Sequence, residues 1–205
     1  TFQYVQGDLS EEETIDSIIS QASDQYVNGI FINSGAPPAK KIEETEMNDW
    51  DASYHSLLRW KVNLVKQLLP KFKAQQFGRI LFLESSSVKQ PIENLVLSTS
   101  LRSAVVGFAK TLSEEIAEHG ITVNILAPGY HDTNALNRLA EKKRIDNGIS
   151  MEEAMEQFRK KTKVGKLGNP MYLASLAHWL LSEEAEFITG QTISVDGGII
   201  KGAFG

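Results

Sequence analysis

Cysteine is absent from the 205-residue chain, which excludes disulfide bonds and thiolate-bound metals. Histidine is scarce as well, and the four histidines share no ligand spacing, so we expect no metal site; they are His55, His119, His131 and His178. No apolar run reaches 18 residues and no signal-peptide pattern is present, so we expect neither a membrane span nor secretion. The lack of cysteine fits a cytoplasmic location.

Positive charge is also in short supply. Lysine and arginine number 21 against 26 acidic residues, which gives a net charge of −5 and a pI of about 5.5. Proteins that read nucleic acid need a basic patch, so we expect no nucleic-acid partner. With 41% hydrophobic and 23% charged residues, the composition is that of an ordinary globular protein, and we interpret residues 1–205 as a single domain.

Short apolar segments alternate with helical patterns along the chain. Five segments rich in Ile, Val, Leu or Phe predict strands: Phe2–Val5, Gly29–Asn33, Arg79–Glu84, Thr122–Ala127 and Thr192–Val195. Nearly continuous apolar strands are typical of a parallel sheet that is covered on both faces. The alternation therefore predicts an α/β fold with right-handed crossovers.

Capping signals mark the helices between these strands. The first predicted helix begins at Ser10, whose pairing with Glu13 has the pattern of a capping box, and runs to about Ala22. The second runs from about Asn48 to Ala74 and is bent or ended near Pro70. The third begins near Ser98 and ends with a C-terminal cap at Gly120. Residues 134–165 are charged and helical, with a second capping box formed by Ser150 and Glu153. A last helix follows Pro170.

Four stretches then appear in a characteristic order. They are "FINSGAPP", "GRILFLESSS", "SAVVGFAKTLSEEIAEHGITVNILAPGYHDT" and "ITGQTISVDGG". Together they resemble the short-chain dehydrogenase/reductase family, within it a group labelled 3-oxoacyl-carrier-protein reductase-like. The resemblance implies a doubly wound Rossmann-type sheet of seven parallel strands in the order 3-2-1-4-5-6-7, with NAD or NADP lying across the carboxyl ends of the strands.

The front of the family pattern is not found in this sequence. The family's first strand, its TGxxxGxG loop and its second strand, which distinguishes NAD from NADP, have no counterpart here. The chain opens at what would be the third strand. We therefore expect roughly 40–55 further N-terminal residues, about one and a half βα units, to complete the sheet.

Three of the four catalytic positions of the family carry other residue types. The family uses a Tyr as acid/base, a Lys four residues later, a Ser thirteen residues earlier and an Asn on the preceding long helix. The corresponding positions here are Ser98, Arg102, Ser85 and Leu57, so Ser85 alone is retained and Arg102 keeps only the charge. An aliphatic hydroxyl is a much weaker acid than a phenol, which predicts a degenerate tetrad.

Two further residues are candidates for the missing acid. Tyr130 and His131 follow Pro128-Gly129, where the family chain passes the nicotinamide. The alternative is that Tyr130 packs under a lid and His131 is exposed. Lys89, four residues past Ser85, would either bind an acidic substrate group or be solvated.

The cofactor side of the family pattern is better preserved. The resemblance assigns cofactor contacts to the end of the first strand, the Asn-Ala-Gly turn and the PGxxxT motif: Asp8, Asn33, Ser34, Gly35, Pro128, Gly129 and Thr133. A Gly is expected in the turn because the backbone passes close to the dinucleotide. Residues 134–165 would form a mobile helical lid over the substrate.

These observations leave two functions open. One is an NAD(P)-dependent oxidoreductase acting on a carbonyl or alcohol with an atypical active site, and the other is a non-catalytic dinucleotide-binding or assembly protein of the same fold. The family also pairs the helices that correspond to those from Asn48 and Ser98 across a two-fold axis, and its C-terminal strand forms a second contact. We therefore expect a homodimer or homotetramer.

Overall fold

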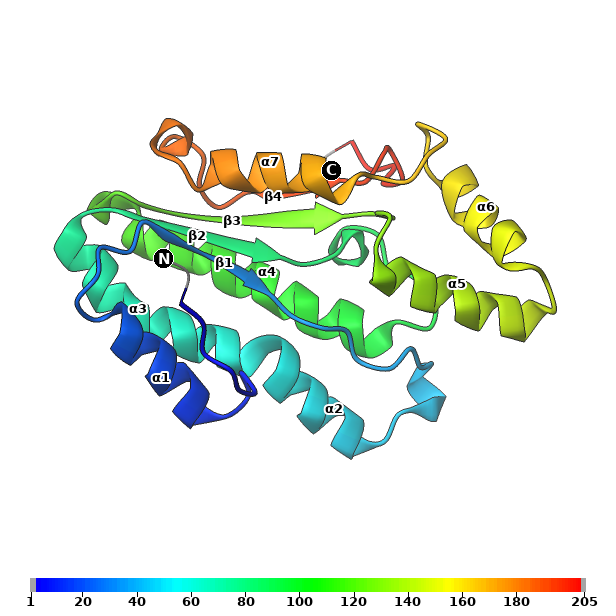
Figure 1. The fold of residues 1–205 in the computed structure, drawn as a ribbon, viewed down its shortest axis with the longest axis horizontal. Coiled ribbons are helices and arrows are strands. Elements are labelled where there is room, and N and C mark those ends of the chain that lie inside the picture. The colour runs from blue at the N-terminus through cyan, green and yellow to red at the C-terminus, as the bar shows by residue number, and fades with distance from the viewer. Residues whose placement is uncertain (1–2, 204–205) are drawn as a thin grey trace.

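The computed structural model describes residues 3–203 and contains a four-stranded parallel sheet (Figure 1). Its strands are β1 (Gly29–Asn33), β2 (Gly78–Leu83), β3 (Ile121–Pro128) and β4 (Thr192–Val195), and they lie side by side in that order. The α/β fold is confirmed, and the order matches the 4-5-6-7 part of the expected sheet. Because all strands run the same way, their carboxyl ends meet at one edge.

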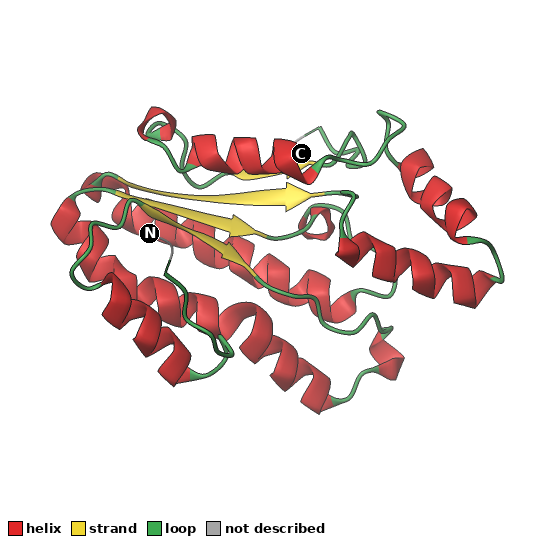
Figure 2. Cartoon of the chain, viewed as in Figure 1, coloured by secondary structure: helices red, strands yellow, loops and turns green. Residues whose placement is uncertain are grey.

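Helices cover both faces of the sheet and connect to its strands through loops (Figure 2). The α-helices are α1 (Glu12–Ala22), α2 (Met47–Tyr54), α3 (Trp60–Gln75), α4 (Val96–Ile116), α5 (Asn134–Asn147), α6 (Met151–Lys161) and α7 (Pro170–Leu180). Short 3₁₀ turns are η1 (Ile42–Glu44), η3 (Ser86–Val88), η4 (Ala117–His119) and η5 (Glu183–Ala185), and η2 (His55–Arg59) is π-helical. None of the helices within residues 3–203 is long and apolar enough to cross a membrane.

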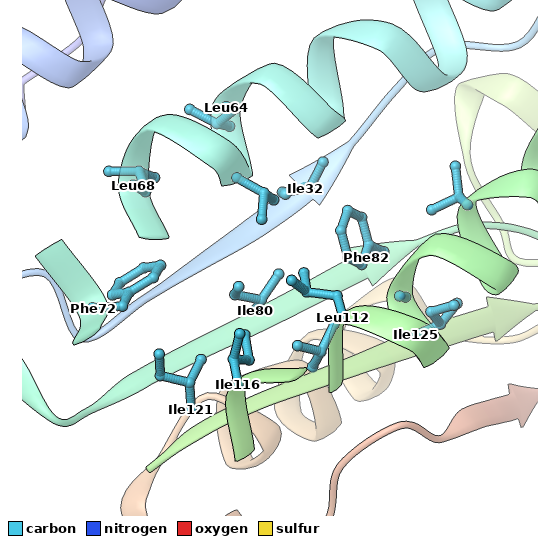
Figure 3. Close-up of a cluster of buried hydrophobic side chains, with 14 of the residues drawn as sticks. Ile32, Leu64, Leu68, Phe72, Ile80, Phe82, Leu112, Ile116, Ile121 and Ile125 are labelled. Carbon is cyan, nitrogen blue, oxygen red and sulfur yellow. The ribbon is translucent and has the colours of Figure 1, made fainter. Parts of the chain in front are cut away.

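The main core lies between the sheet and helices α1, α3 and α4. Figure 3 shows Ile80 and Phe82 of β2 beside side chains of α3 and α4, such as Phe72 and Leu112. These four residues are all buried, at most 6% exposed. The spacing of apolar residues by three or four along α4 places one face of the helix on the sheet, as the sequence predicts.

A smaller core lies on the opposite face, where α7 packs against β2, β3 and β4. Leu81 and Leu126 of the sheet contact Ala177 and Leu180 of α7 there. On β1 the corresponding face is less covered, and Phe31 is 45% exposed. β1 is therefore the thinly covered edge of the described sheet.

Helices α5 and α6 extend beyond the carboxyl edge of the sheet (Figure 1). They pack on each other through a small cluster that includes Leu136, Ala140, Ala154 and Phe158. The capping box at the start of α6 is confirmed, because Ser150 Oγ accepts from Glu153 N–H at 3.2 Å and Glu153 Oε2 accepts from Ser150 N–H at 2.8 Å. Helices α5 and α6 together span most of residues 134–165, the segment that the sequence predicts to form a lid.

Two local predictions are wrong, and a third, at Pro70, is wrong in one of its two alternatives. Residues 3–5 of the expected strand Phe2–Val5 have no strand partner in the described structure, and Phe2 lies outside it. An extended segment without a hydrogen-bonded neighbour does not form a sheet strand. In the strand order that the family resemblance implies, 3-2-1-4-5-6-7, this segment would be strand 3 and would not be next to β1, which would be strand 4.

The capping box at Ser10 does not form, since α1 begins at Glu12 and Ser10 donates instead to Asp8. Pro70 does not end its helix, which continues to Gln75; the departure from α geometry lies earlier, at η2.

Candidate functional site

A cavity of about 550 Å³ lies at the carboxyl ends of β1, β2 and β3, under α5. Its lining includes nine of the eleven residues that the sequence assigned to the site: Asn33, Ser34, Gly35, Ser85, Arg102, Pro128, Gly129, Tyr130 and Thr133. The structure thus brings together segments more than 90 residues apart in the chain. Asp8 and Ser98 are the two that do not line it.

The turn after β1 forms one wall of the cavity. The Ser34 hydroxyl is buried and has no hydrogen-bond partner within residues 3–203. A Cβ added to Gly35 would meet no atom of the chain within 4 Å. Nothing in the described protein therefore requires a glycine at this position, and the need for one would have to come from a ligand.

Asp8 borders a second hollow that shares Asn33, Ser34 and Gly35 with the main cavity. Its carboxylate accepts from the Ser10 backbone N–H at 2.8 Å and from the Ser10 hydroxyl at 2.7 Å. The backbone bond, followed by the hydroxyl bond, lowers the pKa of Asp8 below its ordinary value. Asp8 thus remains an anion beside the β1 turn.

A buried ion network occupies the floor of the site. Glu84, the residue after β2, receives Lys61 Nζ of α3 on Oε1 at 2.5 Å and Arg102 NH1 of α4 on Oε2 at 2.8 Å. The side chains of Lys61 and Glu84 are fully buried, and that of Arg102 is 6% exposed. Two cations share one carboxylate, so the network has a net charge of +1.

Arg102 has two other partners. Its Nε donates to Ser98 Oγ at 3.1 Å, and NH2 donates to the Gly35 carbonyl oxygen at 2.7 Å. The guanidinium therefore joins α4, β2 and the β1 turn, and Ser98 is held as its acceptor. A planar fork with several fixed donors can make these bonds at once, which a lysine ammonium could not match in geometry.

Lys61 and Glu84 were missed in the sequence analysis. Glu84 was placed at the end of a predicted strand without a role, although a carboxylate that ends a buried apolar strand needs a partner. Lys61 follows Leu57 by one helical turn, and Leu57 is itself 1% exposed in η2. Burial lowers the pKa of Lys61, while the charge of Glu84 opposes that shift.

Ser85 has a local structural partner. Its hydroxyl accepts from the Ser87 backbone N–H at 3.1 Å and caps the short turn η3. Ser85 is only half-buried and lines the cavity, so its hydroxyl proton remains available to a ligand. Lys89, at the end of η3, does not line the cavity.

The segment after β3 leads into α5. A Cβ at Gly129 would lie 2.8 Å from Asp196 Cα, so the close approach of the chain after β4 already requires this glycine. Thr133 is the N-cap residue of α5, and its hydroxyl donates to the His131 carbonyl oxygen at 3.4 Å. The first turn of α5 therefore begins at the cavity wall.

Tyr130 packs against the α5–α6 cluster, and His131 is buried. The Tyr130 ring lies 4.8 Å from that of Phe158, and burial raises the pKa of its phenol. The expectation of an exposed His131 is wrong: the side chain is 9% exposed, with Nδ1 3.3 Å from the Gly129 carbonyl oxygen and its ring against Gly168. A backbone bridge between His131 and Gly168 holds the histidine against the segment before α7.

The described residues contain no cluster of three or more His, Asp or Glu side chains able to hold a metal ion.

Comparison with known proteins gives matches over nearly the whole chain. Residues 1–200 match the protein family described as enoyl-(acyl carrier protein) reductase. The NADPH-dependent reductase BacG of Bacillus subtilis is 31% identical over 199 residues, which are 95% of this chain and 76% of that protein. Dehydrogenase/reductase SDR family member 6 of Danio rerio is 30% identical over 93% of this chain and 76% of its own length.

Solved structures show the same architecture. YwfH, an NADPH-dependent reductase involved in bacilysin biosynthesis, superimposes with a TM-score of 0.90 at 28% identity, over 96% of this chain and 76% of that one. L-sorbose reductase from Gluconobacter frateurii, complexed with NADPH and L-sorbose, has a TM-score of 0.89 at 24% identity, over 97% and 76% of the two chains. The latter likeness concerns the fold alone.

Proposed function

The chain belongs to the short-chain dehydrogenase/reductase family, and from this premise we propose that it is an NAD(P)-dependent oxidoreductase acting on a carbonyl or alcohol substrate. The observation that carries the proposal is the convergence of three chain segments on one cavity: Asn33–Gly35, Ser85 and Pro128–Thr133. Open parallel sheets bind dinucleotides outside the carboxyl ends of their strands, which is where this cavity lies.

The residues present fit a dinucleotide. The Ser34 hydroxyl lacks a partner, and the space beside Gly35 is open to a ligand. Asn33, Ser34 and Gly35 would hold the cofactor along the β1 turn, with Asp8 beside the adenosine and Pro128, Gly129 and Thr133 beside the nicotinamide or pyrophosphate. When bound, the nicotinamide supplies hydride to the carbonyl carbon, or takes it from the alcohol. Ser85 is the residue positioned to donate a hydrogen bond to the substrate oxygen.

The proposed active site has a degenerate tetrad. Ser98 is 6% exposed, lies outside the cavity lining and accepts from Arg102; Arg102 is committed to Glu84 and Gly35; Leu57 cannot hold a water molecule. General acid catalysis contributes about 10²–10⁴-fold when the pKa lies near the working pH, and an aliphatic hydroxyl is far from that range. Tyr130 does not repair the deficit, because burial moves its pKa upward. We therefore propose that carbonyl reduction by the usual route of the family is slow.

A non-catalytic dinucleotide-binding or assembly protein is the second candidate. The observation that favours it concerns Arg102, whose three guanidinium nitrogens donate to Ser98, Glu84 and Gly35 of the protein itself and not to a ligand. A lost tetrad with a preserved cofactor wall is what such a protein would show.

The deciding experiment has two readouts on the native protein. Thermal unfolding is followed with NADH or NADPH at up to millimolar concentration, and a ligand of the folded state must raise Tm by mass action. Oxidation of the bound nucleotide is then followed with a panel of ketones and aldehydes. A Tm shift with turnover supports the oxidoreductase, and a shift without turnover supports the second candidate as a dinucleotide-binding protein. No shift with either nucleotide overturns both dinucleotide-binding functions and leaves an assembly protein alone.

A further inference from the structure

The cavity is positively charged although the chain as a whole is acidic. Glu84 is the single acidic side chain among its lining residues, and both of its oxygens are already paired with cations. Two arginines line the same cavity, Arg102 on the floor and Arg138 on α5. Since the network of Lys61, Glu84 and Arg102 has a net charge of +1, Arg138 adds to an existing excess that favours an anionic ligand.

Arg138 differs from the other five arginines of the chain. Arg102 and the other four bind carboxylates or carbonyl oxygens; these four are Arg59, Arg79, Arg144 and Arg159. Arg138 has no hydrogen bond or ion pair with any residue between 3 and 203. Its two-pronged guanidinium, which matches a carboxylate in geometry, is thus left without a partner at the cavity.

Helix α5 presents Arg138 next to apolar side chains. Ala135 precedes Arg138 by three residues and Leu139 by four, so it lies on the same side of the helix as both, and all three line the cavity. Leu139 is 41% exposed, and Leu173 of α7 lies on the same cavity. Arg138 is itself exposed, so its guanidinium is accessible to a ligand, and an anionic group on an apolar body would match both the arginine and its apolar neighbours.

Two kinds of anion can reach this cavity, a phosphate of the dinucleotide and an acidic group of the substrate. The polar turn that suits the cofactor, Asn33–Gly35, follows β1, while Arg138 projects from the lid helix among apolar residues. We infer that the substrate is a carboxylic acid with an apolar body, and that Arg138 binds its carboxylate. This inference rests on the proposed function for the word substrate, and on the cavity alone for the binding of the acid.

The test compares an acid with its ester, which have the same carbonyl and apolar body. The probes are 4-phenyl-2-oxobutanoate and its methyl ester, measured by calorimetric binding with and without NADPH, and by turnover where it occurs. The variants are Arg138→Gln, the charge-preserving Arg138→Lys, and Arg144→Gln as a control. Arg144 lies on the same helix and pairs with Glu141, away from the cavity lining.

The native protein should bind the acid at least tenfold more tightly than the ester. Arg138→Gln should weaken acid binding at least tenfold, Arg138→Lys should restore part of it, and the control should stay within twofold of the native protein. Ester and NADPH binding should change less than twofold in all variants.

Equal binding of acid and ester by the native protein, or an unchanged acid affinity in Arg138→Gln, would overturn the inference. A tenfold loss of NADPH binding in that variant would also overturn it, by assigning Arg138 to a cofactor phosphate. Acid binding without any NADPH binding would leave the inference standing and remove the proposed function instead.

Discussion

Glu84 is the residue on which the buried charges of the site converge. A carboxylate in this position at the end of a buried strand is stable only because Lys61 and Arg102 reach it from two different helices. The same contacts take Arg102 away from the role of the family's lysine. The ion network thus gives a structural reason for the degenerate tetrad that we propose.

Substitution of Glu84 and substitution of Lys61 should have different effects on stability. Glu84→Gln leaves two buried cations uncompensated, so it should destabilise the fold by about 3–5 kcal/mol. Lys61→Met removes the excess cation, keeps a similar volume and leaves a balanced Glu84–Arg102 pair, so it should cost less than about 1 kcal/mol. Urea unfolding with a constant m value measures both. Equal losses in the two variants would show that the network needs the charge of Lys61.

Ser98 is expected to be a structural acceptor and not a proton donor. Ser98→Ala removes the hydroxyl that accepts from Arg102 Nε, so stability should fall by about 1–3 kcal/mol. The kcat/KM of any native dehydrogenase activity should change less than threefold, because Ser98 does not line the cavity. A loss of turnover without loss of fold would show that Ser98 transfers the proton after all.

At the scale of elements, α5 and α6 depend on short-range capping more than on a large core. Helices α5 and α6 share a cluster of four buried side chains, and α6 begins at the Ser150–Glu153 box. Elements with few buried contacts open at low free-energy cost, which suits the lid role that we propose for these two helices.

The capping box predicts a pH-dependent contribution of α6. The backbone N–H of Ser150, followed by its hydroxyl, lowers the pKa of Glu153 in the folded protein. The stabilisation is therefore complete above the ordinary pKa of 4.5 and is lost as the pH falls through the lower folded value.

Glu153→Gln should lower Tm at pH 7, and the difference from the native protein should shrink toward zero near pH 3. Glu13→Gln is the matched control, since Glu13 stands in a similar sequence pattern whose box does not form. A constant Tm difference across this pH range would contradict the prediction.

At the scale of the whole molecule, large apolar side chains remain exposed on two regions. Met47 and Tyr54 on α2 are 73% and 44% exposed, and Met171 and Tyr172 at the start of α7 are 69% and 75% exposed. Exposed apolar groups of this size favour association with another surface. The exposed residues of α2 lie on the helix contact through which we propose a homodimer or homotetramer, and we propose that the start of α7 joins the contact of the C-terminal strand.

Light scattering at micromolar concentration should give two or four times the mass of one chain. Replacing Tyr172 with Glu should reduce a tetramer to dimers, because it places a charge in one of the two proposed contacts without touching the core. The far-ultraviolet circular dichroism of the variant should stay unchanged. A native protein that scatters only as a monomer would count against the assembly.

The sequence by itself determined the features that depend on neighbouring residues. Strands β1 and β4 have the predicted bounds, Gly120 ends its helix turn with a φ of +69°, and the Ser150–Glu153 box forms as expected. Apolar period, turn residues and caps act over a few positions, so a linear reading suffices for them. The family pattern also placed most cavity residues, because it fixes where each strand ends.

Only the tertiary structure decided which of these residues face a ligand and which face one another. Lys61, Glu84 and Arg102 are 18 to 41 positions apart, and no local sequence pattern predicts the ion pairs that they form. The same holds for His131, which forms a bridge with Gly168, and for Ser10, which donates to Asp8 and forms no capping box. Buried charges and rings find partners by proximity in space, which depends on the packing of whole helices against the sheet.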